Sequence, residues 1–446
     1  MKISRNSASL LLVTMAAGAA YAQQPPDPVQ SDSRENTAVG TSALLKLQVT
    51  ESGGLQNTAL GFAALGANVS GIQNAAGGSS ALQFNTSGSY NTAFGSDALF
   101  SNTTGSTNTA VGIESLYSNV SGVQNSAFGA FSLYKNTTGA GNTACGIAAL
   151  EDNTTGSGNT ASGANALMNN GVGASNSSSG YESLYSNTTG SNNTAEGYTA
   201  LYSNTTGASN TASGNHALYF NTTGYHGTGG GAETLFSNTT GNTNVGYGFE
   251  ALYHNTTGSN NTAVGPSAGF NLTTGSNNVD IANEGFAGES GIIRIGAPST
   301  QTQTFIAGIE NSKVTGSAVY VTAGGQLGVL ASSERYKTAI APMGDDTDKL
   351  SLLRPVVFHL KTEPSGQLQY GLIAEEVARV YPALVIRNEA GTIEGVRYDE
   401  LAPMLLNQVQ KQQQRLEKQA ELLRAQAAAL DKMRGQVAEV LERAQR

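Results

Sequence analysis

The sequence contains no tryptophan and a single cysteine, and charged residues make up 12% of it. Because Cys145 stands alone, no disulfide within the chain is possible, and the fold must be held by other means. Basic residues are nearly missing from the middle of the chain, where Lys135 is the only lysine or arginine between residues 57 and 290. Together with a net charge of −9, this argues against a nucleic acid as a partner.

Long apolar runs are also missing, apart from residues 8–20 near the N-terminus. Lys2 and Arg5 precede this run, and Ala20-Tyr21-Ala22 follows it as a small-x-small cleavage site. The pattern predicts a signal peptide over residues 1–22, and the run is too short to cross a membrane. We therefore expect no transmembrane segment and an exported protein that is extracellular, bound to the cell surface or periplasmic.

What the chain does have is a repeat of 17 residues, N-T-A-x-G-x-x-A-L-x-x-N-T-T-G-x-x. Copies start at residues 57, 74, 91, 108, 125, 142, 159, 176, 193, 210, 227, 244 and 261. An outlying copy starts at Asn36, inside an N-terminal linker over residues 23–56, and a degraded copy starts at Asn278. A fixed period over residues 57–290 predicts a solenoid or a fibre with one coil per copy.

The columns of the repeat have physical meanings. Position 5 and position 15 are glycine in all thirteen copies, which predicts two corners per coil with positive φ or close backbone approach. Position 9 is leucine in twelve copies and forms a thin core, whereas the asparagines at position 12 suit a turn and a ladder. One leucine and a few alanines per coil bury little, so we expect several chains, most simply three, to share a core. The repeat resembles the head repeats of trimeric autotransporter adhesins, which form a trimeric β-roll.

Other columns raise functional alternatives that the residues favour less. The aromatic residues at position 10 predict a packing ladder more than a sugar-stacking surface. The acids at position 7 predict a solvated face more than a calcium site, and the threonines give only weak support for an ice-binding face. His216, His226 and His254 lie in three different columns without metal-ligand spacing. We predict no cofactor and no metal site.

The last third of the chain is no longer repetitive. Residues 291–331 predict a β-rich neck, with strands at 292–295, 303–309 and 318–322. Residues 332–406 predict a small α+β domain with strands at 355–361, 368–373, 383–387 and 392–396 and a helix at 374–381. A long helix begins near Tyr398, and its segment 407–446 predicts a coiled coil because apolar residues recur every seven positions. These are Val409, Leu416, Leu423, Leu430 and Val437 at position a, with Leu405, Gln412, Gln419, Gln426, Met433 and Val440 at position d. The fold class is mainly β.

Four ordered blocks carry a second resemblance: SSERYKTAI (332–340), LRPVVFHLK (353–361), YGLIAEEVARVYPALV (370–385) and GVRYDELAPMLL (395–406). Together they resemble the C-terminal intramolecular chaperone and auto-processing domain of endosialidase-type phage tail spikes and related bacterial proteins. The resemblance implies a homotrimer and self-cleavage between Ala331 and Ser332. It implies Ser332 as the nucleophile, Lys337 as its base and Arg335 as a supporting residue, while Ser333 stands where that family usually has aspartate.

The same chemistry can be argued from the residues. A serine hydroxyl needs a neighbouring base, and a lysine serves as one only where desolvation or nearby positive charge makes it neutral. The alternative for this stretch is a serine cap on a short helix beside a solvated lysine. We predict a secreted homotrimeric fibre that cuts itself. Its expected partners are sister copies of the chain and a cell-surface glycan or host surface. The alternatives are an uncleaved trimeric structural or adhesive protein whose tail serves only for trimerisation, and a carbohydrate-binding or carbohydrate-active spike.

Overall fold

The structure is a computed structural model that describes residues 30–47, 53–298, 300–307, 318–322, 324–388 and 390–445. The predicted signal peptide, residues 1–22, lies outside the described residues. The chain divides into two compact units, Met1–Phe305 and Ile306–Arg446, and each is considered by itself.

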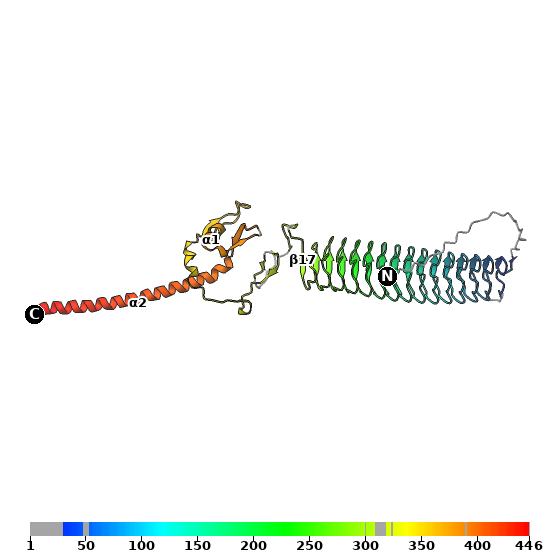
Figure 1. The fold of residues 1–446 in the computed structure, drawn as a ribbon, viewed down its shortest axis with the longest axis horizontal. Helices are drawn as coiled ribbons and strands as arrows, with labels where there is room; N and C mark the ends of the chain where they lie inside the picture. Colours follow the sequence, from blue (N-terminus) through cyan, green and yellow to red (C-terminus); the bar gives the residue numbers. More distant parts are fainter. Residues whose placement is uncertain are drawn as a thin grey trace, which may run out of the picture. The chain divides into compact units, whose positions relative to one another are not determined.

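The first unit is a parallel β-solenoid in which each copy of the repeat forms one coil, as predicted (Figure 1). Its sheet has 17 strands. They are β1 (Gln30–Ser31), β2 (Thr37–Val39), β3 (Thr58–Leu60), β4 (Ala75–Gly77), β5 (Thr92–Phe94), β6 (Thr109–Val111), β7 (Ser126–Phe128), β8 (Thr143–Cys145), β9 (Thr160–Ser162), β10 (Ser177–Ser179), β11 (Thr194–Glu196), β12 (Thr211–Ser213), β13 (Thr228–Gly230), β14 (Val245–Tyr247), β15 (Thr262–Val264), β16 (Val279–Ile281) and β17 (Ile293–Ile295). β1 pairs antiparallel with β2, and the other pairings are parallel, with Thr194 opposite Thr211 as an example of the register.

The solenoid encloses its own core. Leu99, Leu116 and the other leucines at position 9 are fully buried, with 0% exposed, against alanines at positions 3 and 8. Burying one such leucine stabilises a fold by about 1.5–3 kcal/mol. The expectation that several chains share the core of the rod is therefore wrong, because one chain closes each coil without help.

Two ladders of buried asparagines run along the core, as the sequence predicts for position 12. At position 12, Asn102 Nδ2 donates to Asn85 Oδ1 at 2.7 Å and to Gly105 O at 3.0 Å. At position 1, the backbone amide of Asn91 donates to Asn74 Oδ1 at 3.0 Å and its Nδ2 donates to the same atom at 3.1 Å. Each coil is thereby hydrogen-bonded to the preceding coil by side chains as well as by the sheet, which satisfies polar groups that burial would otherwise leave unpaired.

Both glycine columns behave as predicted. Gly112, at position 5, has φ +137°, and a Cβ there would lie 2.5 Å from Gly129 O. Gly122, at position 15, has no positive φ, but a Cβ there would lie 2.3 Å from Asn119 Oδ1. Position 5 therefore needs glycine for its backbone conformation, and position 15 needs it for the close approach of the asparagine ladder.

The aromatic residues at position 10 stack on one another, as the packing-ladder interpretation predicts. Tyr185, Tyr202 and Tyr219 follow at centroid distances of 5.2 Å with interplanar angles of 6° and 4°. Because neighbouring rings cover each other's faces, only ring edges remain open between the ends of a stack. This arrangement disfavours face-on stacking of a sugar along the column.

The two ends of the position-1 ladder are closed by different groups. At the N-terminal end, Asp32 accepts the backbone amide of Asn36 at 3.0 Å and its Nδ2 at 2.8 Å, which lowers the pKa of the Asp32 carboxyl. At the other end, the amide of Ile292 donates to Asn278 Oδ1 at 3.0 Å.

The second unit is a small α+β fold that continues into a long helix. Its elements are β18 (Tyr320–Val321), β19 (Leu327–Gly328), η1 (Glu334–Tyr336), η2 (Gly344–Leu352), β20 (Val356–Phe358), β21 (Gln369–Gly371), α1 (Ala374–Val380), η3 (Pro382–Leu384), β22 (Val385–Arg387), β23 (Ile393–Val396) and α2 (Tyr398–Ala444). The pairs β18–β19, β20–β21 and β22–β23 are antiparallel. The four strands and the helix expected between 355 and 396 are present.

One strand of the predicted neck is not present as expected. Residues 303–307 form no strand, and residues 308–309 lie outside the described residues. The strand expected at 292–295 is β17, which pairs with β16 and extends the sheet of the solenoid. The hairpin β18–β19 accounts for the strand expected at 318–322.

Candidate processing site and association surface

The candidate processing site lies on a single-turn helix just after β19. Ser333 has an extended backbone, with φ −65° and ψ 141°, and directly precedes η1. The amide of Tyr336 donates to Ser333 O at 3.0 Å, and the amide of Lys337 donates to Glu334 O at 2.9 Å. The Ser333 hydroxyl makes no capping hydrogen bond. Ser333 thus occupies the N-cap position that the serine-cap alternative predicts, but its side chain does not cap the helix.

The predicted nucleophile and base flank η1 and face solvent. Ser332, Arg335 and Lys337 are all exposed, and the Arg335 guanidinium lies 4.8 Å from the centre of the Tyr336 ring. In the part of the chain that the structure describes, no hydrogen bond joins Ser332 to Lys337. A single chain therefore leaves both side chains exposed and does not join them. A serine–lysine pair needs a desolvated lysine, so other groups must cover it before it can act.

The unit that carries this site is fastened to the first turns of α2. Thr347, in η2, is fully buried and accepts a hydrogen bond from Asn407 Nδ2 at 2.7 Å. Lys411 Nζ lies 2.7 Å from Asp345 Oδ1, and this ammonium holds the pKa of the Asp345 carboxyl below its usual value. An apolar core lies beside these contacts and comprises Val377, Leu384, Val385, Val396 and Met404.

Beyond these turns, α2 presents an apolar stripe that nothing in the described chain covers. The residues at heptad position a are between 55% and 64% exposed: Val409, Leu416, Leu423, Leu430 and Val437. At position d, Met433 and Val440 are also exposed. A helix with an uncovered a/d stripe is marginal in water, whereas a coiled coil buries that stripe. The stripe therefore has the residue spacing and the exposure that a coiled-coil interface would require.

The sequence analysis missed a charged cluster at the C-terminal end of the solenoid. Asp280, in β16, is 1% exposed, and neither of its carboxylate oxygens has a hydrogen-bond partner among the described residues. Arg294 pairs with Glu289 through three contacts of 2.7–3.1 Å. Burial, together with the Glu289 carboxylate and against the Arg294 charge, raises the pKa of Asp280 to about 6. The available signal was an aspartate at position 3, where most copies have alanine.

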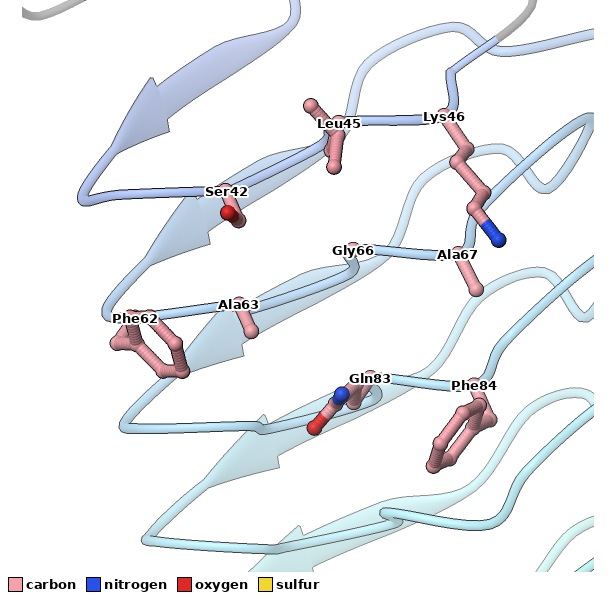
Figure 2. A pocket seen from close by; sticks show the side chains of 9 residues that line it. All are labelled: Ser42, Leu45, Lys46, Phe62, Ala63, Gly66, Ala67, Gln83 and Phe84. Carbon is pink, nitrogen blue, oxygen red and sulfur yellow. The ribbon is translucent and has the colours of Figure 1, made fainter.

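A hollow of about 270 Å³ lies on the first coils of the solenoid (Figure 2). It forms where position 10 has no aromatic residue, because Leu45, Gly66 and Gln83 stand there. Figure 2 shows Phe62 and Phe84 at its edges and Lys46 as its only charged side chain. One cation without a carboxylate supplies no acid–base pair, so the hollow does not support catalysis.

The histidines of the rod lie against aromatic rings. The His216 ring is 5.5 Å from the rings of Tyr198 and Tyr219, and the His254 ring is 4.6 Å from Phe270. Within the described residues, no group of three His, Cys, Asp or Glu side chains could hold a metal ion.

Comparison with known families bears on the second unit. Residues 332–386 match the family model described as chaperone of endosialidase. The C-terminal unit therefore carries a chaperone-of-endosialidase domain. The match begins at Ser332 and ends in β22, so it includes η1, the β20–β21 hairpin and α1. It confirms the family resemblance and covers the first three ordered sequence blocks, whereas the fourth block, residues 395–406, lies beyond the match. No curated protein and no solved structure matches the chain.

The solenoid and the whole of α2 lie outside the matched residues. A repetitive β rod followed by such a domain fits a protein of the tail-spike or fibre type. Among the described helices, none is long and apolar enough to cross a membrane.

Proposed function

We propose that this protein is an exported homotrimeric fibre whose C-terminal domain assembles the chains and then cuts itself off. The observation that carries the proposal is the chaperone-of-endosialidase match at residues 332–386, placed between a β-solenoid rod and a helix with an uncovered heptad stripe. The mature rod would serve as a structural or adhesive element, with a cell-surface glycan or a host surface as its target.

The role of the tail follows from the contrast between the two units. The rod closes its core within one chain, so rods of separate chains can meet only through their surfaces, whereas α2 leaves its apolar stripe uncovered. Bringing three chains together through α2 raises their local concentration and aligns their ends. The chaperone domain thus acts on folding and association, and the finished rod no longer needs it.

The proposed cleavage uses Ser332 as nucleophile. Its Oγ attacks the carbonyl carbon of Ala331 while Lys337 accepts the hydroxyl proton, and the bond from that carbon to the Ser332 nitrogen breaks. The nitrogen takes up a proton and becomes a free amine, and Ala331 is held as an ester on Oγ. Water then attacks the ester, leaving a carboxylate at Ala331 and restoring the hydroxyl, so the net reaction consumes one water molecule.

Because Ser332 and Lys337 are exposed in one chain, the proposed cleavage would require other copies of the chain. Ser332 and Lys337 are open to solvent in the single chain, so Lys337 would gain its desolvated setting from neighbouring copies. Arg335 and the Lys337 residues of sister chains would add positive charge that favours a neutral base. Cleavage would then follow assembly and report that folding is complete.

Intact mass of the protein expressed as residues 23–446 tests the proposal. The wild-type chain should yield a fragment that begins at Ser332, and Ser332→Ala and Lys337→Ala should abolish it. Ser333→Ala is the matched control, because it removes the neighbouring hydroxyl and should leave cleavage in place. A wild-type chain that is trimeric by native mass and yet stays intact would refute self-cleavage and leave the uncleaved structural or adhesive protein.

The carbohydrate-active alternative finds less support in the rod. Ring faces in the aromatic column are covered by neighbouring rings. Glycoside hydrolysis usually needs two carboxyl groups that flank one bond. A polysaccharide depolymerisation assay on the mature rod would decide this alternative, because a positive result would require an acid pair that the repeat does not provide.

A further inference from the structure

One face of the rod combines exposed apolar side chains with almost no charge. We call it the strand-exit face and define it as positions 4 and 6 of the repeat, the last residue of each strand and the second residue after it. Position 3 points into the core, so position 4 points outward, as β6 shows with Ala110 buried and Val111 exposed. Six large apolar side chains in its N-terminal half are 44–61% exposed: Leu60, Phe62, Phe94, Ile113, Phe128 and Ile147.

The exposed apolar area of the face lies at the upper end of what an ordinary monomer leaves uncovered, before its C-terminal part is counted. A large apolar side chain that is half exposed leaves about 100 Å² open, so these six contribute on the order of 600 Å². Tyr247, Phe249 and Val264 extend the same columns further along the rod. The largest apolar patch on a typical monomer is about 300–600 Å², whereas a standard interface buries about 800 Å² on each partner. The strand-exit face therefore has the size of an interface.

Charge indicates which partner fits. Glu196 is the single charged residue at positions 4 and 6 in the thirteen copies. The other acids of these copies lie at positions 7, 10 and 11: Asp97, Glu114, Glu151, Asp152, Glu182, Glu233 and Glu250. Two acidic rods that approach through those columns repel each other. Tyr198, at position 6, lines the same hollow as Glu182 and Glu233 at position 7, so position 4, apart from Glu196, is the part of the strand-exit face that lets two rods meet without opposing charges. A strongly acidic partner would be repelled by the rod as a whole.

Geometry points to the same partner. The columns run along the length of the rod, because each strand pairs with the strand of the following copy, as Thr109 does with Ser126. A second solenoid of equal pitch matches such a column coil by coil, while a globular partner touches only a few coils. We propose that the strand-exit face is where the rods of neighbouring copies of this chain lie side by side, parallel and in register. This inference rests on the proposed homotrimer and names the rod surface that it uses.

The single cysteine supplies a probe. Cys145 stands at position 4 and is exposed, so parallel copies in register would place their Cys145 thiols at equal height on the shared face. A short bismaleimide added to the full chain should then yield covalent dimers on a denaturing gel. In the control Cys145→Ser/Thr155→Cys, the thiol moves to an exposed residue at position 14 of the same coil, and cross-linking should fall about tenfold or more.

A second variant tests the apolar contacts themselves. Phe94→Ser/Phe128→Ser should reduce the Cys145 cross-link while the circular dichroism of the rod stays unchanged, because both rings lie outside the core.

Native mass separates the possible failures. A trimer in which Cys145 does not cross-link, or in which the Thr155→Cys control cross-links as well, overturns the assigned face and leaves the proposed function standing. A monomer overturns both the face and the proposed homotrimer. A trimer that cross-links through Cys145 and loses the cross-link in the double serine variant supports the proposal.

Discussion

Gly227 interrupts an otherwise continuous ladder of asparagines. At this position the neighbouring coils have Asn210 and Asn244. The amide of Gly227 still donates to Asn210 Oδ1 at 2.8 Å, but within the described residues the amide of Asn244 has no acceptor. Asn244 Nδ2 instead reaches the second ladder, at 3.5 Å from Asn238 Oδ1. A buried donor left unpaired costs about 1–3 kcal/mol.

Gly227→Asn should therefore stabilise the rod. Gly227 has no positive φ, and a Cβ there would lie 3.1 Å from Asn210 Oδ1, an atom that would accept the new Nδ2 donor. We expect a gain of about 1–3 kcal/mol in the free energy of unfolding, measured by denaturant titration. Gly227→Ala is the control, since it adds a Cβ without a hydrogen bond. An equal effect of the two substitutions would contradict the explanation.

The raised pKa of the Asp280 carboxyl predicts how this group makes stability depend on pH. Its pKa in the folded protein is raised from 3.8 to about 6, so the folded state binds the proton more tightly than the unfolded chain. The contribution of Asp280 to stability should therefore be largest below about pH 4, fall as pH rises through about 6, and stay lower above it, by about 1–3 kcal/mol in all.

Asp280→Asn should remove this fall and raise the unfolding temperature at pH 7.5 more than at pH 4. Glu284→Gln serves as a control, because Glu284 is an exposed carboxylate near the same end of the rod. If both variants keep the wild-type slope, the buried carboxylate is not its source.

The leucines at position 9 show where reasoning from single residues stops. All twelve have φ between 51° and 56°, in the left-handed region that costs an L-residue roughly 1–2 kcal/mol. The sequence analysis assigned positive φ to glycine alone, because glycine adopts it without strain. Contacts with the next coil hold the leucines in this conformation: the amide of Leu99 donates to Ser115 O at 3.0 Å, and the Leu99 side chain is buried.

Among the elements, α2 gives the most direct test of association. Leu423 is 64% exposed and lies at heptad position a, whereas Ala428 lies on another side of the same helix. Leu423→Asp should place a charge in the helix interface and lower the native mass of the full chain, because a buried unpaired charge is costly. Ala428→Asp introduces the same charge outside the interface and should leave the native mass unchanged. Equal behaviour of the two variants would argue against a coiled coil.

The elements could be predicted to different degrees. The solenoid, the antiparallel strands after residue 355 and α1 follow from period, alternation and turn residues, which are local signals. The closed core did not follow from the sequence, because a count of apolar residues cannot show that a small coil buries one leucine completely. The exposure of Ser332 and Lys337 could not be predicted from the sequence either, since the spacing of residues along the chain does not determine whether they are buried.

At the scale of the whole molecule, the two units depend on association in different ways. The rod closes its core within one chain, so copies would add stability only along its surface. The second unit leaves the apolar stripe of α2 uncovered, so that helix would rely on partners. Release of the tail would therefore remove the element that gathers the chains, and rods that came apart afterwards would have lost their means of reassembly. Persistence of the processed fibre would then be governed by the rate of dissociation.

The closed ends of the asparagine ladder have a consequence for how such proteins change in evolution. Asp32 completes the hydrogen bonds of the first asparagine, the amide of Ile292 completes those of the last, and the coils between them are hydrogen-bonded chiefly to their neighbours. Whole copies could be deleted or duplicated without disturbing either end. Each copy gained or lost would change the length of the rod by about 4.8 Å, so the length of the rod could change in equal steps.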